Sequence, residues 1–116
     1  MIRGDIYDVD FESSKGRGAN KTRPAIVVSN DFSNKAANFN ARGLVVVVPV
    51  SSNTERVYPF QVLVAAGRSS GLRDESKAQV EQLRAIDVGR LRKRRGVVAT
   101  SEMVAIDAAL RLHLAL

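Results

Sequence analysis

Apolar and polar positions alternate in the first part of the chain, and uninterrupted apolar runs follow. Residues 7–12 alternate between Tyr, Val or Phe and an acid, which predicts a half-buried strand within Ile2–Phe11. Ala25–Val28 is a short apolar run with β-branched residues, which favour strands. Leu44–Val48 is the most apolar run and predicts a central strand that ends at or just past Pro49. These three segments predict the body of a β-sheet.

The next part of the chain gives weaker and partly conflicting signals. Val57–Ala66 alternates imperfectly and predicts a strand with an edge or bend at Pro59. Lys77–Asp87 is rich in good helix formers, although its alternate residues could also form one face of a strand. Propensity alone predicts a helix there. Arg95–Val98 predicts a last short strand, and Arg90–Arg95 a solvated turn.

The C-terminal segment has the period of an amphipathic helix. Apolar residues recur at i, i+3, i+7 and i+11 from Met103 to Leu114. Thr100 or Ser101 can cap this helix, and Glu102 lies in its first turn, where a carboxylate is favourable. We therefore predict a C-terminal helix, with His113 a packed or surface side chain beside its apolar stripe and Asp107 paired with Arg111 four residues later.

Clusters of Ser, Gly and Asn separate these elements and predict loops. The loops are Glu12–Asn20, Asn30–Asn40, Ser51–Thr54 and Gly67–Asp74. No repeat, low-complexity tract or linker divides the chain, and 45% apolar residues suffice for a core. The sequence predicts one domain over residues 1–116, mainly β with α.

The amino-acid composition limits the kinds of functional site and binding partner that this chain can have. With no cysteine and one histidine, a disulfide framework and a Cys- or His-built metal site are both implausible. No signal peptide or membrane span is evident, so we expect a cytoplasmic protein. The net charge of +6 is clustered, with four cations and no acid in Lys15–Arg23 and six cations against Asp87 in Arg84–Arg95. Such clusters favour a polyanionic binding partner, with nucleic acid as the first candidate and an acidic protein or a membrane surface as the others. The alternative is that these cations simply face solvent.

Arg23 is the most informative single position. Pro24 biases it towards extended backbone, so it lies at the start of a strand on a rigid base. The preceding Gly-rich loop is not a nucleotide-binding P-loop, because Asn20 rather than Gly precedes Lys21 and a strand follows. Hydroxyl groups at Ser51–Thr54 follow the central strand, and strand ends are where functional residues tend to lie.

Six short segments carry further motifs: Arg3–Tyr7, Thr22–Asp31, Pro49–Thr54, Tyr58–Val62, Lys77–Asp87 and Ile106–Leu110. In this order they resemble the MazF/PemK family of toxin endoribonucleases. The resemblance implies a small SH3-like, partly open barrel of the PemK/CcdB type with a C-terminal helix, in a two-fold symmetric homodimer. It also implies that Lys77–Ile86 is a strand, against its propensity.

The resemblance further implies a sequence-specific, metal-independent endoribonuclease that needs no cofactor. Members cut single-stranded RNA, chiefly mRNA, and leave a 2′,3′-cyclic phosphate and a 5′-hydroxyl. A cognate MazE-like antitoxin with an acidic, disordered tail is the implied protein partner, and its tail would compete with RNA for the same cations. No membrane partner is implied.

Carried over by motif, the family's catalytic residues fall on Arg23 and Ser51. A guanidinium can stabilise charge on the phosphate oxygens, and a hydroxyl can donate to the same phosphate. The expected RNA-binding residues are Lys15, Arg17, Lys21, Thr22, Ser52, Asn53 and Arg84. Many relatives carry a Glu in the first loop, where Gly16–Ala19 has no carboxylate, so the general base stays open among Glu12, Asp31 and Glu81.

A second hypothesis keeps the barrel and drops the catalysis. The same fold would then be a nucleic-acid-binding module, or a CcdB-like toxin that binds DNA gyrase. RNA cleavage separates the two hypotheses, because a binding module would shift RNA mobility or inhibit supercoiling without cutting RNA.

Overall fold

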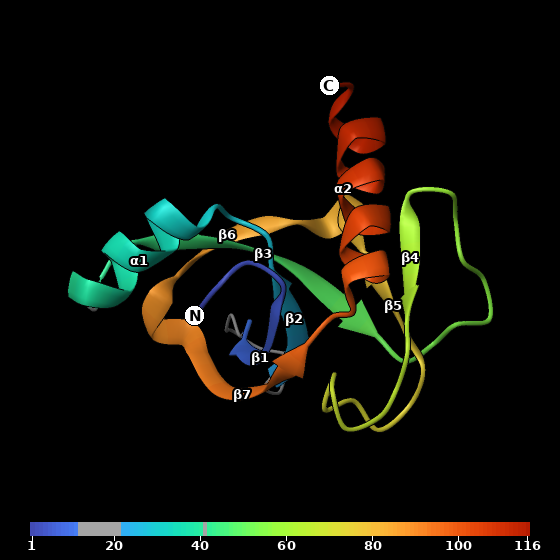
Figure 1. Cartoon of the computed structure of the whole chain (residues 1–116), viewed down its shortest axis with the longest axis horizontal. Helices are drawn as coiled ribbons and strands as arrows, with labels where there is room; N and C mark the ends of the chain where they lie inside the picture. Colours follow the sequence, from blue (N-terminus) through green and yellow to red (C-terminus); the bar gives the residue numbers. More distant parts are fainter. Residues whose placement is uncertain (12–21, 41) are drawn as a thin grey trace, which may run out of the picture.

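The computed structural model describes residues 1–11, 22–40 and 42–116 (Figure 1). Its regular elements are a seven-stranded sheet, two α-helices and two short 3₁₀ turns. The strands are β1 (Asp5–Asp10), β2 (Thr22–Val27), β3 (Leu44–Ser51), β4 (Gln61–Val64), β5 (Ser76–Gln79), β6 (Arg84–Asp87) and β7 (Leu91–Val97). The helices are α1 (Asp31–Asn40) and α2 (Thr100–Leu114), and the 3₁₀ turns are Val80–Gln82 and Val88–Arg90.

All strand pairs are antiparallel, in the order β4-β5-β3-β2-β1-β7, with β6 on β3. One edge of β3 serves both β5 and β6, since β5 pairs at Val50–Ser51 and β6 at Leu44–Val47. The single 3₁₀ turn Val80–Gln82 separates them. The helix that propensity predicts for Lys77–Asp87 is therefore wrong, and the strand implied by the resemblance is right apart from this turn. Ladder pairing and burial outweigh the small helix preferences.

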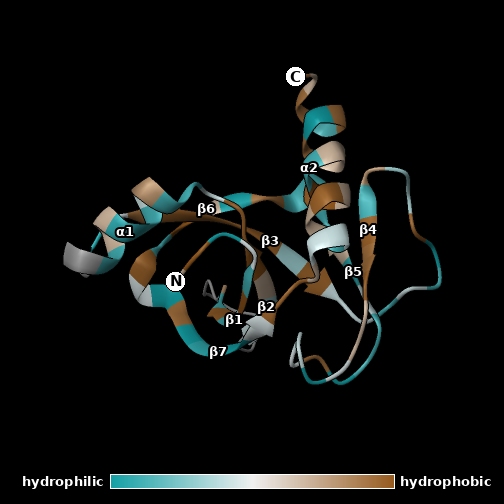
Figure 2. Cartoon of the chain, in the orientation of Figure 1, coloured by the Kyte–Doolittle hydropathy of each residue, from teal (hydrophilic) through white to brown (hydrophobic). Residues whose placement is uncertain are grey.

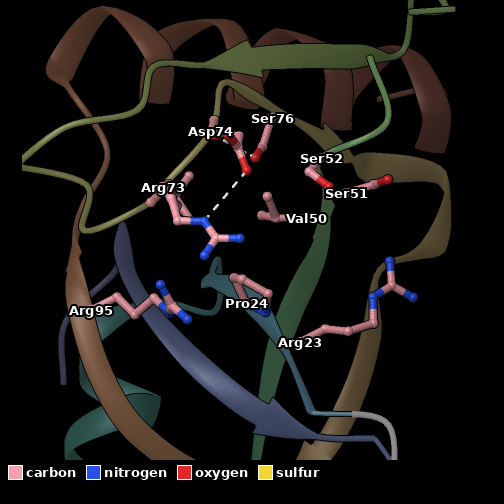
Figure 3. A pocket seen from close by; sticks show the side chains of 10 residues that line it. Arg23, Pro24, Val50, Ser51, Ser52, Arg73, Asp74, Ser76 and Arg95 are labelled. Atoms are coloured by element: carbon pink, nitrogen blue, oxygen red, sulfur yellow. Dashed lines mark hydrogen bonds and ion pairs between the residues drawn. The ribbon is translucent and has the colours of Figure 1, made fainter. Parts of the chain in front are cut away.

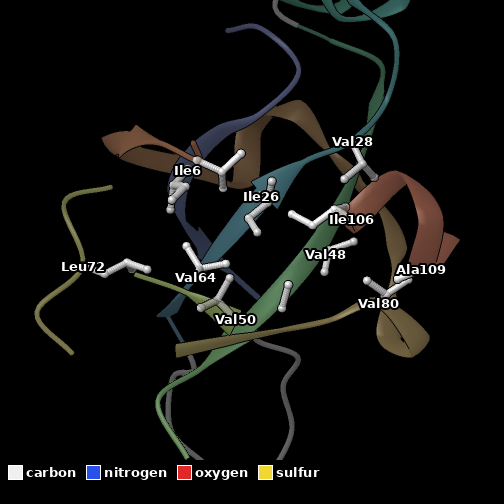
Figure 4. Packing of buried hydrophobic residues seen from close by; sticks show 12 residues of the cluster. Ile6, Ile26, Val28, Val48, Val50, Val64, Leu72, Val80, Ile106 and Ala109 are labelled. Atoms are coloured by element: carbon white, nitrogen blue, oxygen red, sulfur yellow. The ribbon is translucent and has the colours of Figure 1, made fainter. Parts of the chain in front are cut away.

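The sheet buries apolar side chains on both faces, as β2 and β3 show. On one face, Ile26, Val48 and Val50 pack in a cluster with Ile106 of α2 (Figure 4). On the other face, the cluster is Val9, Ala25, Val27, Ala37, Val45, Val47 and Ile86. Successive strand residues point to opposite faces, so a strand covered on both sides must be apolar at every position. This explains why β3 is brown over most of its length, with a pale stretch near its end (Figure 2).

The Arg3-Gly4-Asp5 segment joins the start of the chain to the end of β2 and to α2. Gly4 has φ +101°, which a side chain would strain, and its N–H donates to Val27 O at 2.8 Å. Arg3 donates to Val28 O at 2.7 Å and pairs with Asp107 of α2 at 2.8 Å. The predicted Asp107–Arg111 pair is therefore replaced by a longer-range one, and the motif has a clear role in the fold.

Helix α1 corrects the loop predicted over Asn30–Asn40. Asn30 caps it, because its Oδ1 accepts from the N–H of Ser33 at 2.8 Å. Asn34 is fully buried, donates to Ser29 O at 2.8 Å and bonds the Ser29 hydroxyl, which itself accepts from Val46 N–H. Two of the asparagines that suggest a loop are thus a capping residue, Asn30, and a buried polar residue, Asn34, of a short helix.

Strand β7 is longer than the predicted Arg95–Val98. It includes Arg92, Arg94 and Arg95 from the predicted solvated turn, whereas β4 is shorter than predicted. Near its end, β7 meets the loop that follows β4. Val97 N–H donates to Ser69 O at 2.9 Å, and a Cβ at Gly96 would lie 2.1 Å from the same oxygen. Glycine permits this contact, which partly closes the barrel.

The C-terminal helix is confirmed, with a different start. Neither Thr100 nor Ser101 caps it; Glu102 accepts from the N–H of Ala99 and from that of Ala65, both at 2.8 Å. The helix rises beside β4 (Figure 1). His113 is exposed, with its ring centroid 6.4 Å from that of Phe60. No helix in the described residues is long and apolar enough to cross a membrane.

Candidate active site

Arg23 and Ser51 come together through the β2–β3 register. The β2–β3 ladder ends at the Ala25–Pro49 pair, and the same register continued by two residues puts Arg23 opposite Ser51. Opposite residues of an antiparallel pair point to the same face. On the other edge of β3, Ser51 pairs with Lys77 of β5. The guanidinium, the hydroxyl and the ammonium therefore form one row across three strands.

Arg23 is half-buried and held by a neutral partner. Its Nη2 donates to Oε1 of Gln79 at 2.8 Å, across the sheet from β2 to β5. Pro24 fixes the backbone on its other side. Within the described residues, no carboxylate forms an ion pair with this guanidinium. Arg23 is thus oriented without being neutralised, as a phosphate-binding cation must be.

Ser51 is oriented by the turn that follows β3. The backbone N–H of Asn53 donates to Ser51 Oγ at 3.1 Å, and Asn53 Oδ1 accepts from Glu55 N–H at 3.1 Å. A hydroxyl that accepts a hydrogen bond keeps its own hydrogen for donation. Beside it, Lys77 is 9% exposed, and its Nζ donates to Arg56 O at 2.7 Å. That bond ties the loop after Ser51 to β5.

An open cleft of about 780 Å³ adjoins this row (Figure 3). Residues from β2, β3, β7 and the segment before β5 line it: Arg23, Pro24, Val50, Ser51, Ser52, Leu72, Arg73, Asp74, Ser76 and Arg95. The two predicted catalytic residues therefore border one cavity, together with Ser52 from the predicted RNA-binding set.

The other predicted RNA-binding residues divide into two groups. Thr22 is exposed at the start of β2 beside Arg23, and Asn53 is exposed in the turn after β3. Arg84 of β6 pairs with Val47, which puts it on the face of β3 that carries Ser51, and its guanidinium lies 5.2 Å from the centroid of the Phe11 ring. Lys15, Arg17 and Lys21 lie outside the described residues.

The candidate general bases lie away from this row where the structure describes them. Asp31 begins α1 and accepts from the N–H of Arg3 at 2.6 Å. Glu81 accepts from Gln61 Nε2 at 2.9 Å and does not line the cleft. Glu12 lies outside the described residues. The carboxylate that lines the cleft is Asp74, which the sequence does not single out.

Sequence reasoning also misses Gln79, Lys77 and Arg73. The first two alternate on one face of β5, and this signal becomes visible once Lys77–Ile86 is taken as a strand. Arg73 lies in the turn-rich segment 67–74, where no periodicity marks it. Among the described residues, no group of three His, Cys, Asp or Glu side chains is placed to hold a metal ion.

The fold and the site define a small, partly open β-barrel that presents cations and hydroxyls at its strand ends. Such a surface suits a phosphodiester chain. The chain belongs to the family of PemK-like, MazF-like toxins of type II toxin–antitoxin systems, whose family model matches residues 2–114.

Named relatives are similar over most of the chain. Endoribonuclease MazF9 of Mycobacterium tuberculosis is 48% identical over 114 residues, which cover 98% of this chain and 96% of the relative. The probable endoribonuclease MazF1 of the same organism is 48% identical over 75 residues, 65% of this chain and 81% of the relative. A solved endoribonuclease in complex with its cognate antitoxin, from a mycobacterial species, superposes with a TM-score of 0.78 at 26% identity, covering 100% of this chain and 96% of that one.

Proposed function

We propose that this chain, as one domain over residues 1–116, is the toxin of a toxin–antitoxin pair. Its activity is sequence-specific, metal-independent cleavage of single-stranded RNA to 2′,3′-cyclic phosphate and 5′-hydroxyl ends. The observation that carries the proposal is the Arg23–Ser51 row in a chain 48% identical to a named endoribonuclease. The proposed substrate is messenger RNA, and ribosomal and transfer RNA are further candidate substrates.

In the proposed reaction, the 2′-oxygen of one nucleotide attacks the neighbouring phosphorus. The new O2′–P bond replaces the P–O5′ bond, the 2′-hydroxyl gives up its proton, and the leaving 5′-oxygen takes one up. Negative charge builds on the non-bridging oxygens, where Arg23 can bind two of them at once. Ser51 donates its hydroxyl hydrogen to the same phosphate, since its own oxygen already accepts from Asn53 N–H.

The proposed partners follow from the exposed cations. An antitoxin with an acidic, disordered tail would bind over Arg23 and Arg84, and would displace RNA from the same face. A solved relative is described in complex with its cognate antitoxin. We also propose a two-fold symmetric homodimer in the cytoplasm, where mRNA is translated.

The test is cleavage of long single-stranded RNA by the purified chain in excess EDTA. We expect discrete fragments whose ends carry cyclic phosphate and 5′-hydroxyl groups, mapped by ligation that accepts only 5′-hydroxyl ends. Fragments that need added Mg²⁺, or RNA whose mobility shifts without cutting, would overturn the proposal; the second result would favour the non-catalytic binding module.

A further inference from the structure

The cleft continues beyond the Arg23–Ser51 row onto the opposite face of the sheet. Neighbouring strand residues alternate between faces, so Val50 points away from the side of Ser51. Here Pro24 is half-buried and gives the cleft its accessible apolar surface, over the buried Val50 and Leu72.

A cation, Arg73, and a carboxylate, Asp74, also line this part of the cleft. The side chains of Arg73 and Asp74 are 88% and 66% exposed, and Nε of Arg73 lies 3.8 Å from Oδ2 of Asp74. This pair is long and solvated, so it holds neither side chain firmly. Figure 3 shows Asp74 above Val50 and Arg73 to its left, both apart from Arg23. Each is available to a ligand.

The combination fits a nucleotide better than a free phosphate. Asp74 would repel an anion held deep in the cleft, whereas a carboxylate accepts well from the N–H groups of a base. An apolar surface suits the faces of a base, and single-stranded RNA is recognised through unstacked bases of this kind. The volume of about 780 Å³ is within the range of small-molecule pockets.

We propose that this part of the cleft is a base-selecting pocket for the nucleotide next to the scissile phosphate. The assignment rests on the proposed function. The base lies against Pro24, Asp74 accepts from its Watson–Crick edge, and Arg73 binds the adjoining phosphate.

Asp74 then discriminates against uracil. Guanine presents two adjacent N–H groups, and adenine and cytosine each present an amino group. Uracil presents one N–H between two carbonyl oxygens, which a carboxylate repels. A site built to hydrogen-bond one group rejects the analogue that lacks it, because its own polar atoms are left unpaired.

The test separates binding from cutting. A randomised RNA pool with 2′-fluoro sugars has no attacking hydroxyl, so binding to the purified chain is measured by sequencing the retained molecules. We expect one position depleted in uracil, and we expect Asp74→Asn to relax that depletion by about tenfold, as for loss of one base contact. Glu75→Gln is the matched control, since Glu75 is exposed and outside the cleft lining.

Arg73→Ala should act differently. It should weaken binding to every sequence to a similar extent and leave the base preference unchanged, as loss of a phosphate contact does. The same base profile for wild type and Asp74→Asn, or no retained RNA at all, would overturn the pocket. Unmodified RNA assayed in parallel reports on the proposed function separately, because an Asp74-dependent profile without cutting would keep the pocket and overturn the nuclease.

Discussion

Two sets of arginines in this barrel carry the same charge but have different interaction partners. Arg92, Arg94 and Arg95 of β7 each pair with an acid of β1: Asp10 at 3.1 Å, Asp5 at 3.0 Å and Asp8 at 2.7 Å. Arg23 donates instead to the amide of Gln79, and Arg84 lies over the ring of Phe11.

The paired arginines hold an outer strand in place. Asp5 is 3% exposed, and the hydrogen bond from Arg94 to its carboxylate raises the pKa of Arg94 above its ordinary value. The pKa of the nearby Tyr7 hydroxyl is also raised, first by burial and then by Asp5. An arginine with such a partner is largely neutralised where it stands, whereas Arg23 and Arg84 keep a positive field for a polyanion. The number of arginines in a segment therefore overestimates the positive charge that the segment offers to RNA.

The comparison is tested most strongly by Arg23→Ala against Arg94→Ala. We expect Arg23→Ala to lower the single-turnover cleavage rate by about 10²–10³-fold, as for loss of an oxyanion donor, with unfolding unchanged. Arg94→Ala should instead lower the free energy of unfolding and leave the rate within a few-fold. Urea denaturation and RNA cleavage measured on both variants check this; equal rates for the two would refute the division into two sets.

Gln79→Glu gives Arg23 an acidic partner like those of the β7 arginines. It keeps an acceptor for Arg23 and adds a negative charge, so we expect a loss of about 10–100-fold in cleavage and weaker RNA binding. If Gln79 were only a structural acceptor, the glutamate would serve as well and activity would be kept. Gln82→Glu, at an exposed position of the neighbouring 3₁₀ turn, is the control for added charge.

Asp5→Ala tests the paired β7 arginines by removing an acidic partner instead of an arginine. It removes the partner of Arg94 and leaves the N–H of Ile2, which donates to Asp5 at 2.9 Å, without that acceptor. We expect the free energy of unfolding to fall by about 1–3 kcal/mol, the usual range for a lost hydrogen bond of a buried group. Asp74→Ala, which removes an exposed pair, should change it by less than about 0.5 kcal/mol. Similar losses in urea denaturation would contradict the assignment.

The sequence predicts β1, β2, β3 and α2 well, because their apolar patterns are set by burial against the sheet. It fails at α1, where low-propensity asparagines are held by Asn30 capping and by the buried Asn34. It fails at Arg90–Arg95 because the three β1 acids that pair with this run lie far away in the chain. Local patterns do not contain such long-range partners.

The residues of the candidate site also divide into those that the sequence predicts and those that it does not. Arg23 and Ser51 stand out in the sequence because each adjoins a clear strand, and the resemblance links them. Gln79 and Lys77 do not, since their strand looks helical by propensity and only the β3 ladder brings them to the row. Asp74 and Arg73 lie in an irregular segment whose position depends on the contact between Ser69 and β7.

Arg84→Gln tests the smallest difference between the two sets. Arg84 is exposed and has no ion pair among the described residues, so its loss should remove one phosphate contact. The slope of log affinity against log salt should then fall by about one. Arg92→Gln should change the slope by much less, because Asp10 already offsets that charge. Equal changes would mean that the β1 acids do not withhold the β7 arginines from RNA, and that a cation count predicts this surface after all.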